Sequence, residues 1–427
     1  MRAESLPVTS SQASIARHYA RVRAQTLRLV EGLSAEDCAL QSMPDASPLK
    51  WHLAHTTWFF ETFVLERYAP DHTPFQPAFR YLYNSYYNAI GEQYPRAQRG
   101  LLSRPTVNEI RDYRDAVDAQ VGDLLATQTL TDEALAIVEL GLHHEQQHQE
   151  LMLTDVKHLL SMNPLSPAYR DGGFDTRESA LPMGWSAFDG GVVRVGHGGV
   201  GHGGAGFAFD NEWPSHQQHL VAFELADRAV SNGEYLEFVE DGGYRQPALW
   251  LSDGWAAMRS QGWEGPAYWR SRDGVRVEFT LQGEQPLDPA RPVTHVSQFE
   301  ADAYARWAQA RLPTEFEWEI AAAGAPVQGN FVESGALHPR VSACDGLAGL
   351  YGDVWEWTQS AYAPYPGYRA APGAVGEYNG KFMSNQYVLR GGSCATPQSH
   401  IRATYRNFFP SGARWQFSGI RLARDLS

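Results

Sequence analysis

The sequence predicts an α+β protein of two domains: a four-helix bundle over residues 1–165 and a mixed α/β domain over residues 182–427. Three observations support this. A chain of 427 residues exceeds the usual size of a single domain. Apolar residues recur at helical spacing through most of the first part. From Pro182 onward the apolar runs become short and are separated by turn signals, while glycine and tryptophan become frequent.

The predicted helices of the first part are long and have recognisable ends. They cover residues 14–30, 48–68, 106–125 and 131–162. Gly32 follows the end of the first. Thr106 and Glu109 form the Thr-x-x-Glu pattern of a capping box at the start of the third. The fourth ends before Pro164, because proline cannot continue the hydrogen bonds of a helix. Four such helices predict a bundle.

The remaining segments are irregular or short. Residues 69–105 contain Pro, Gly, Asn and five tyrosines without periodicity, which predicts a long loop, and loops of this length are usually functional. Residues 163–181 read as a linker. The second part contains the glycine-rich segment VGHGGVGHGGAG and one credible helix, residues 298–310, followed by RLPTEFEWEIAAAG.

Composition excludes several classes of protein. The net charge of -14 and the lack of a Lys/Arg run argue against nucleic-acid binding, which needs a basic face. No apolar run approaches the roughly 20 residues that span a bilayer, and the N-terminus MRAESLPVTS lacks the apolar core of a signal peptide. Cys38, Cys344 and Cys394 are too dispersed for a disulfide framework or a Cys-x-x-Cys metal site. We therefore expect a cytoplasmic protein with no membrane partner.

Histidines provide the candidate metal site. In GLHHEQQHQELML, His144 and His148 are four residues apart on a predicted helix, so both imidazoles lie on one face. A third imidazole is available from His55 in WHLAH, on another bundle helix, and bundle cores are where facing helices build metal sites. We set His52 and His143 aside as packing or surface residues; His143 points about 100° away from its neighbour on the helix.

Three neutral imidazoles would leave open positions on a metal. Imidazole suits zinc, copper and iron, so the ligand set alone does not name the ion. Zinc would activate a water molecule, and iron(II) would give a dioxygen site. Gln147, three residues after His144, offers an amide on nearly the same face for orienting a polar substrate.

Longer motifs resemble a known family. The chain contains SPLKWHLAHTTWFFETFVL, YNSYYNAIGEQYPRAQRGLLSRPT, HHEQQHQELML and LRGGSCATPQSHIRATYRNFFPSGARWQFSGIRLARD. These resemble the oxygen-dependent sulfoxide synthases of ergothioneine biosynthesis, to which the selenoneine synthases are closely related. The resemblance covers nearly the whole chain. It implies a DinB-like helical bundle followed by a formylglycine-generating-enzyme-like domain with a C-type-lectin-like core.

The resemblance also implies roles for residues. The iron(II) ligands would be His55, His144 and His148, and Gln147 would hold the imidazole of hercynine. A quaternary ammonium cannot donate a hydrogen bond and is best held by aromatic faces. The substrate's trimethylammonium and carboxylate groups would then contact the C-terminal residues Asn407, Phe408, Phe409, Trp415 and Phe417.

The loop would supply the remaining groups. A hydroxyl donor near dioxygen would favour C–S coupling over simple thiol oxidation, and Tyr86 and Tyr87 are the candidates, from the family branch with a YY pair. Arg96 and Arg99 offer guanidinium groups for the carboxylate of the thiol substrate. We expect that thiol to be cysteine, bound directly by these arginines; the other branch of the family uses γ-glutamylcysteine.

Alternative functions stay open at this point. No residue distinguishes a thiol from a selenosugar as the chalcogen donor. A formylglycine-generating oxidase needs two nearby cysteines late in the chain, and only Cys394 is present there. A zinc-dependent DinB-type thiol transferase would show no dependence on O2, and a lectin-like binding module would consume no thiol.

Overall fold

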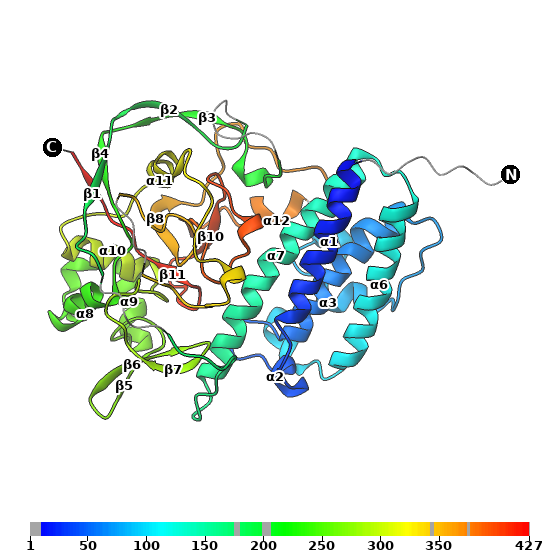
Figure 1. Cartoon of the computed structure of the whole chain (residues 1–427), viewed down its shortest axis with the longest axis horizontal. Helices are drawn as coiled ribbons and strands as arrows, with labels where there is room; N and C mark the ends of the chain where they lie inside the picture. Colours follow the sequence, from blue (N-terminus) through cyan, green and yellow to red (C-terminus); the bar gives the residue numbers. More distant parts are fainter. Residues whose placement is uncertain (1–9, 175–179, 199–205, 342–345, 374–375, 427) are drawn as a thin grey trace. The chain divides into compact units, whose positions relative to one another are not determined.

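The chain forms two compact units in the computed structural model (Figure 1). One comprises residues 1–162 with Pro372–Tyr378, and the other comprises Asn163–Ala371 with Asn379–Ser427. The structure describes residues 10–174, 180–198, 206–341, 346–373 and 376–426. Residues 1–9, Cys344 and most of the glycine-rich segment that the sequence analysis singled out lie outside the described residues.

The first unit is built on long helices that match the four predicted ones. They are α1 (Ser10–Arg28), α3 (Leu49–Phe60), α6 (Val107–Thr127) and α7 (Asp132–Ser161). The predicted helix over 48–68 is continued beyond α3 by a π-helical turn, η1 (Glu61–Leu65), and by α4 (Glu66–Tyr68). The capping box of Thr106 and Glu109 is confirmed at the start of α6, and Thr131 caps α7.

The segment predicted as a long loop contains only short helical turns. They are α5 (Phe79–Leu82), η2 (Asn88–Ile90) and η3 (Arg96–Leu101); α2 (Ala35–Ala39) is a similar short helix before α3. The buried side chain of Asn84 donates to the carbonyls of Tyr87, Gly91 and Glu92. These bonds fold the loop back on itself in place of regular secondary structure.

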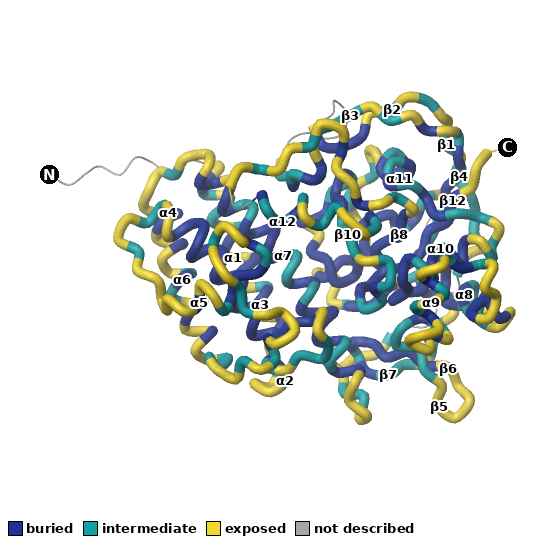
Figure 2. Tube along the Cα trace, turned by 180° about the vertical axis from the view of Figure 1, so that it is seen from behind, coloured by how far each residue is buried: buried dark blue, intermediate teal, exposed yellow. Residues whose placement is uncertain are grey.

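The core of the bundle is centred on α3, all of whose residues are buried. Its aromatic residues approach α7 closely at Gly141, where a Cβ atom would lie only 2.7 Å from the ring of Phe60 and 2.8 Å from that of Phe59. The carboxylate of Glu145, fully buried on α7, bonds to Arg23 and Arg114. Figure 2 shows that buried residues fill the interior of each unit.

The second unit contains several small sheets and a set of helices. The strands are β1 (Trp185–Phe188), β2 (Gly191–Val195), β3 (His216–Leu220), β4 (Phe223–Ala226), β5 (Trp269–Arg272), β6 (Val275–Thr280), β7 (Gly283–Pro286), β8 (Trp355–Ala361), β9 (Gln386–Arg390), β10 (Asn407–Pro410), β11 (Ser418–Gly419) and β12 (Ala423–Asp425). They form sheets in the orders β1-β4-β12, β10-β9-β8-β11, β2-β3 and β5-β6-β7. In the central sheet β8, β9 and β10 are antiparallel, while β11 pairs with β8 in parallel.

The helices of this unit outnumber the one that was expected. They are α8 (Asn232–Glu240), α9 (Ser252–Gln261), α10 (Gln298–Trp307), α11 (Glu315–Ala322) and α12 (Glu377–Gly380), the last of which crosses the boundary between the units. The helix predicted over 298–310 is α10. The expectation of one helix was wrong; like α10, the other helices have at most ten residues, and periodicity is a weak signal over so few. The capping box of Ser231 and Glu234 at α8 was a signal that could have revealed it.

Candidate metal centre

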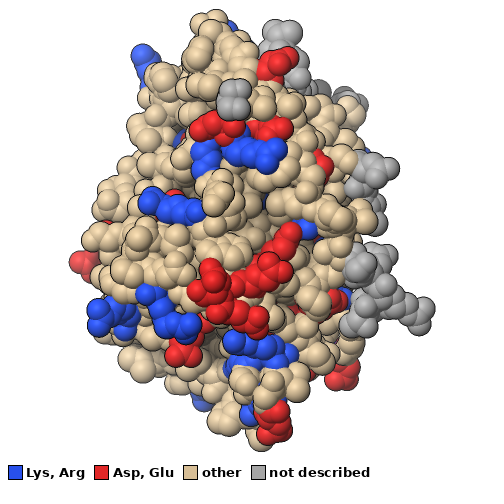
Figure 3. Space-filling view, turned by 90° about the vertical axis from the view of Figure 1, so that its left-hand side faces the viewer, with Lys and Arg blue, Asp and Glu red and all other residues tan. Residues whose placement is uncertain are grey.

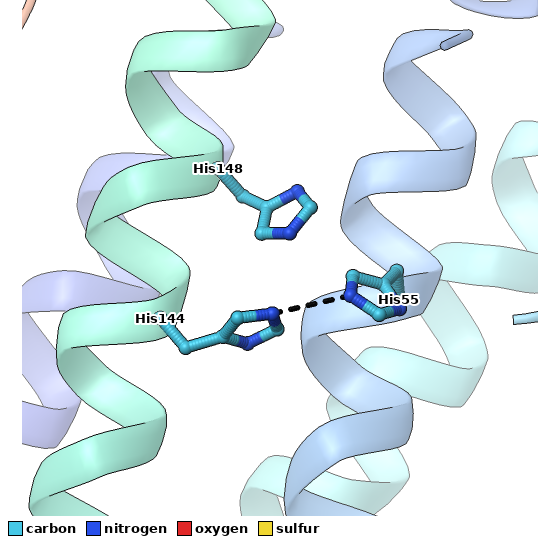
Figure 4. Close-up of side chains that lie close together, drawn as sticks. All are labelled: His55, His144 and His148. Carbon is cyan, nitrogen blue, oxygen red and sulfur yellow. Dashed lines mark hydrogen bonds between the residues drawn. The ribbon is translucent and has the colours of Figure 1, made fainter. Parts of the chain in front are cut away.

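Three histidine side chains converge in the core of the bundle (Figure 4). His55 comes from α3, and His144 and His148 come from successive turns of α7. The Nε2 atoms of His55 and His144 are 3.1 Å apart, and one ligand atom from each of the three residues lies within 4.8 Å of the others. All three side chains are buried. The structure thus brings together the predicted triad from two helices.

The hydrogen bonds of the rings show which nitrogens face one another. Nδ1 of His55 lies 2.6 Å from the carbonyl oxygen of Tyr83. Nδ1 of His148 lies 2.8 Å from Nδ1 of His52. Nδ1 of His144 is buried without a hydrogen-bond partner among the described residues. Each ring therefore has its Nε2 atom available for a common ligand.

Burial keeps these imidazoles neutral. It lowers the pKa of His144 to about 4. Burial, followed by the neighbouring His144, lowers the pKa of His55 well below its usual value, and burial followed by His55 does the same for the pKa of His148. Neutral imidazole is the form that binds a metal ion. Three such nitrogens fit an ion that accepts imidazole ligands, including iron(II).

Aromatic rings enclose the triad. His55 is stacked between Trp51, at 4.6 Å between centroids, and Trp58, at 5.6 Å. The ring of Phe59 lies 4.9 Å from that of His144. A ligand at the triad would therefore sit in a largely apolar environment within the bundle, where electrostatic interactions are stronger than in water.

A cavity of about 430 Å³ opens in the loop of the same unit. Its lining includes Tyr86, Arg96 and Arg99. Arg96 donates to the hydroxyl oxygen of Tyr86 at 2.6 Å. The side chain of Tyr87, by contrast, is buried against Trp58, at 5.7 Å between ring centroids. The two predicted tyrosines thus have different surroundings.

Arg99 is a buried cation that forms no direct ion pair among the described residues, although the carboxylate of Asp155 lies near enough to favour its charge. Its side chain donates to the hydroxyls of Ser47 and Ser85, both at 2.9 Å, and Nε has no partner in the described structure. Among the residues that the structure describes, no carboxylate forms an ion pair with it. Burial, followed by the charge of Arg96, lowers its pKa to about 9. A buried guanidinium in this state is suited to an anionic group from a ligand.

Comparison with known proteins identifies the family. Residues 18–152 match the model of the DinB superfamily, and residues 187–344 and 341–426 match that of the sulfatase-modifying factor enzyme 1-like domain. The chain is 35% identical to the hercynine oxygenase of Mycobacterium tuberculosis, over 98% of this chain and 100% of that protein. It is also 35% identical to the hercynine oxygenase of Mycolicibacterium smegmatis, over 97% of this chain and 99% of that protein.

The chain belongs to the hercynine oxygenase family. The resemblance predicted from the sequence motifs is thereby confirmed, as is the combination of a DinB-like helical domain with a formylglycine-generating-enzyme-like domain.

The second half of this hercynine oxygenase family member is also similar to another class of enzyme. It is 32% identical to the formylglycine-generating enzyme of Thermomonospora curvata, over 57% of this chain and 94% of that protein. Cys394 is buried, as is Cys38 in the first unit.

The predicted substrate residues of the C-terminal segment lie in the second unit. Phe408, on β10, stacks on Tyr362 with centroids 4.1 Å apart. Phe409 and Trp415 meet edge to face at 6.3 Å, and both are partly exposed. The side-chain oxygen of Asn407 accepts from the backbone N–H of Phe408.

Phe417 occupies a different kind of position. It has no exposed surface, and its ring lies 4.8 Å from that of His295. Its surroundings are those of a core residue, so we do not include it among the substrate contacts proposed below. Gln147 is half-buried on α7, one residue before His148.

Sequence reasoning missed two residues beside the triad, His52 and Asp155. His52, set aside earlier, bonds to both His148 and Asp155. Asp155 follows His148 by seven residues, which places both on one face of a helix, and this spacing was a usable signal. His143 is buried close to His18, at 6.3 Å between rings, and has no place in the triad.

The described surface carries charged side chains of both signs (Figure 3). On the face drawn in Figure 3, Lys and Arg side chains are interspersed with Asp and Glu side chains among the described residues. No helix of the described chain is long and apolar enough to cross a membrane.

Proposed function

We propose that this protein is an iron(II)- and O2-dependent enzyme that joins the sulfur of a cysteine-type thiol to C2 of the hercynine imidazole, giving a sulfoxide. One observation carries the proposal: three buried imidazole Nε2 atoms converge in a chain similar over nearly its whole length to hercynine oxygenases. Small-molecule substrates are also consistent with the cavity of about 430 Å³ in the loop of the same unit.

The triad is the proposed iron site. Iron held by His55, His144 and His148 would supply the activation of dioxygen, with positions left open for substrates. The protein's part is to keep the three rings neutral and oriented. Burial keeps them neutral, and the Tyr83 carbonyl orients His55.

The cavity is the proposed thiol-substrate site. A carboxylate of the thiol would pair with the guanidinium of Arg99, which is buried and has no direct ion pair among the described residues. Arg96, exposed at the cavity, would offer a second charge. Such pairing would restore a compensated buried charge, which favours binding.

Hercynine would present an imidazole, a trimethylammonium group and a carboxylate to the protein. Gln147 is the candidate for the imidazole, because it adjoins His148 on α7. For the other two groups the sequence-based candidates stand as predictions: Phe408, Phe409 and Trp415 for the trimethylammonium group, which needs aromatic faces, and Asn407 for the carboxylate. We propose Tyr86 and Tyr87 as hydroxyl donors that direct the reaction toward coupling instead of thiol oxidation.

The test is a reconstitution of the full chain with iron(II) under anaerobic conditions, in the presence of hercynine. Cysteine, γ-glutamylcysteine and a selenosugar are offered separately, air is admitted, and the products are identified by mass. We expect a sulfoxide from one of the two thiols, and its loss in His144→Ala. His158→Ala, on the same helix but outside the triad, is the matched control.

The outcomes separate the competing functions. A C–Se product without any sulfoxide would show that the chain makes selenoneine. A protein that holds only zinc and consumes no O2 with any substrate would refute an iron oxygenase and favour a thiol transferase. Absence of thiol consumption altogether would favour a binding module.

A further inference from the structure

One histidine of the triad is connected to a buried carboxylate through a fourth histidine. Nδ1 of His148 lies 2.8 Å from Nδ1 of His52, and Nε2 of His52 lies 2.9 Å from Oδ2 of Asp155. All three side chains are within the bundle, with His52 2% and Asp155 4% exposed. The chain of bonds crosses from α7 to α3 and back to α7.

We propose that His52 is a positioning residue that links the metal ligand His148 to Asp155 and so fixes the tautomer and orientation of that ligand. The proposal rests on the proposed function, because it takes the triad as a metal site.

The positions of the ring protons support one direction of donation along the hydrogen bonds from His148 through His52 to Asp155. If Nε2 of His148 binds a metal ion, its one proton is on Nδ1, which then donates to Nδ1 of His52. His52 must then have its proton on Nε2, which donates to the carboxylate of Asp155. Every ring nitrogen thus has one role. The reverse direction would place a proton on Nε2 of His148, the atom needed by the metal.

The three proposed ligands differ in the hydrogen-bond partner of Nδ1, the ring nitrogen that would not bind the metal. His55 is held by a backbone carbonyl, at 2.6 Å from Tyr83, and Nδ1 of His144 has no partner among the described residues. Of the three, His148 is the one connected to a charged group. A carboxylate behind a metal-bound histidine increases the ring's basicity and restrains its rotation. We therefore expect His148 to be the most strongly donating ligand.

The far end of this series of hydrogen bonds connects to Arg99, which lines the proposed thiol site. Oδ2 of Asp155 also accepts from the backbone N–H of Ser47 at 2.8 Å. The hydroxyl of that serine in turn accepts from Arg99 at 2.9 Å. The same residues that orient His148 thus help to place the guanidinium proposed to bind the thiol's carboxylate.

The test compares His52→Leu with His52→Gln in the full chain, using Co(II) as the probe. Leucine removes both hydrogen bonds, whereas the glutamine amide offers one acceptor and one donor as the imidazole does. We expect His52→Leu to weaken Co(II) binding by about 10- to 100-fold, as measured by chelator competition. It should also alter the visible absorption of bound Co(II), and His52→Gln should recover most of both. His158→Leu is the control, because His158 is a histidine of α7 that bonds to Ser42.

Two results would overturn the proposal: unchanged Co(II) affinity and absorption in His52→Leu, or a His52→Gln variant as weak as His52→Leu, which would indicate packing alone. If His52→Leu does not fold, ¹⁵N NMR of the Zn(II)-loaded parent protein decides. A proton on Nδ1 of His148 that is protected from exchange and hydrogen-bonded to His52 supports the proposal. The absence of such a proton refutes the proposal. If the parent protein binds no Co(II), or if His148→Ala binds it equally well, the triad itself fails as a metal site.

Discussion

The guanidinium carbon of Arg99 lies 3.4 Å from the ring centroid of Trp51. The same indole stacks on His55, with centroids 4.6 Å apart and an angle of 14° between the planes. One tryptophan of α3 thus contacts both the buried cation of the cavity and a histidine of the triad. A substrate anion bound at Arg99 would be held one aromatic ring away from the proposed metal.

The first prediction concerns Arg99. Replacing it with methionine should raise the KM for the thiol about 10- to 100-fold, since a hydrogen bond to a charged group is worth about 1.5–3 kcal/mol. Stability should not fall by more than about 1 kcal/mol, because the structure pairs no carboxylate with this arginine and none would be left unpaired. Steady-state kinetics and urea unfolding measure the two effects. An unchanged KM for the thiol would exclude Arg99 as the anchor.

The second prediction separates the two tyrosines. Tyr86→Phe loses the hydroxyl that accepts from Arg96 at 2.6 Å, so it should raise the KM for the thiol as well as alter the products. Tyr87→Phe leaves the buried ring in place against Trp58 and should alter the products alone. The ratio of coupled sulfoxide to oxidised thiol, measured by mass spectrometry, tests both. If neither variant changes that ratio, neither tyrosine is the donor.

The third prediction concerns packing beside the triad. Gly141→Ala would place a methyl group 2.8 Å or less from the rings of Phe59 and Phe60, and should destabilise the bundle by about 1–3 kcal/mol. Gly122→Ala on α6 meets nothing within 4 Å and should instead stabilise by about 0.4–1 kcal/mol. Thermal unfolding of the two variants should therefore shift in opposite directions. A higher unfolding midpoint in Gly141→Ala would show that helix propensity outweighs the close contact with the two rings.

The fourth prediction is a dependence of stability on pH. Burial alone would raise the pKa of Glu145, but Arg114 and Arg23 lower this pKa to about 2. A carboxylate with a depressed pKa stabilises the fold above its unfolded pKa of about 4.3, and this contribution is lost as the pH falls from there toward 2. Arg114→Met should cost about 3–5 kcal/mol at pH 7, because it uncovers a buried charge.

The comparison is made by urea unfolding at two pH values. The difference in the free energy of unfolding between the parent protein and Arg114→Met should be smaller at pH 3 than at pH 7. An equal gap at the two pH values would mean that arginine packing, and not its charge on Glu145, accounts for the loss. Thr127→Ser, at the exposed C-terminal end of α6, is a suitable surface control.

The sequence alone was enough for the long helices and for the candidate ligands. Periodicity over many turns, a capping box at Thr106 and a proline at residue 164 are local signals, and local signals determine where α1, α3, α6 and α7 lie. The spacing of His144 and His148 is also local, because four residues are about one turn. The short helices α8 and α9 escaped prediction, whereas α10, which is no longer than α9, did not, because periodicity over ten residues or fewer is a weak signal.

Only the tertiary structure decided which histidines act together and what holds them. That His55 and not His52 faces the other two depends on the rotation of α3 against α7, which side-chain packing in the core sets. The role of His52, the burial of Phe417 and the hydrogen bonds of Arg99 to Ser47 and Ser85 likewise involve residues distant in sequence. Contacts of this kind leave no periodic trace in the chain, because they arise from the packing of whole elements.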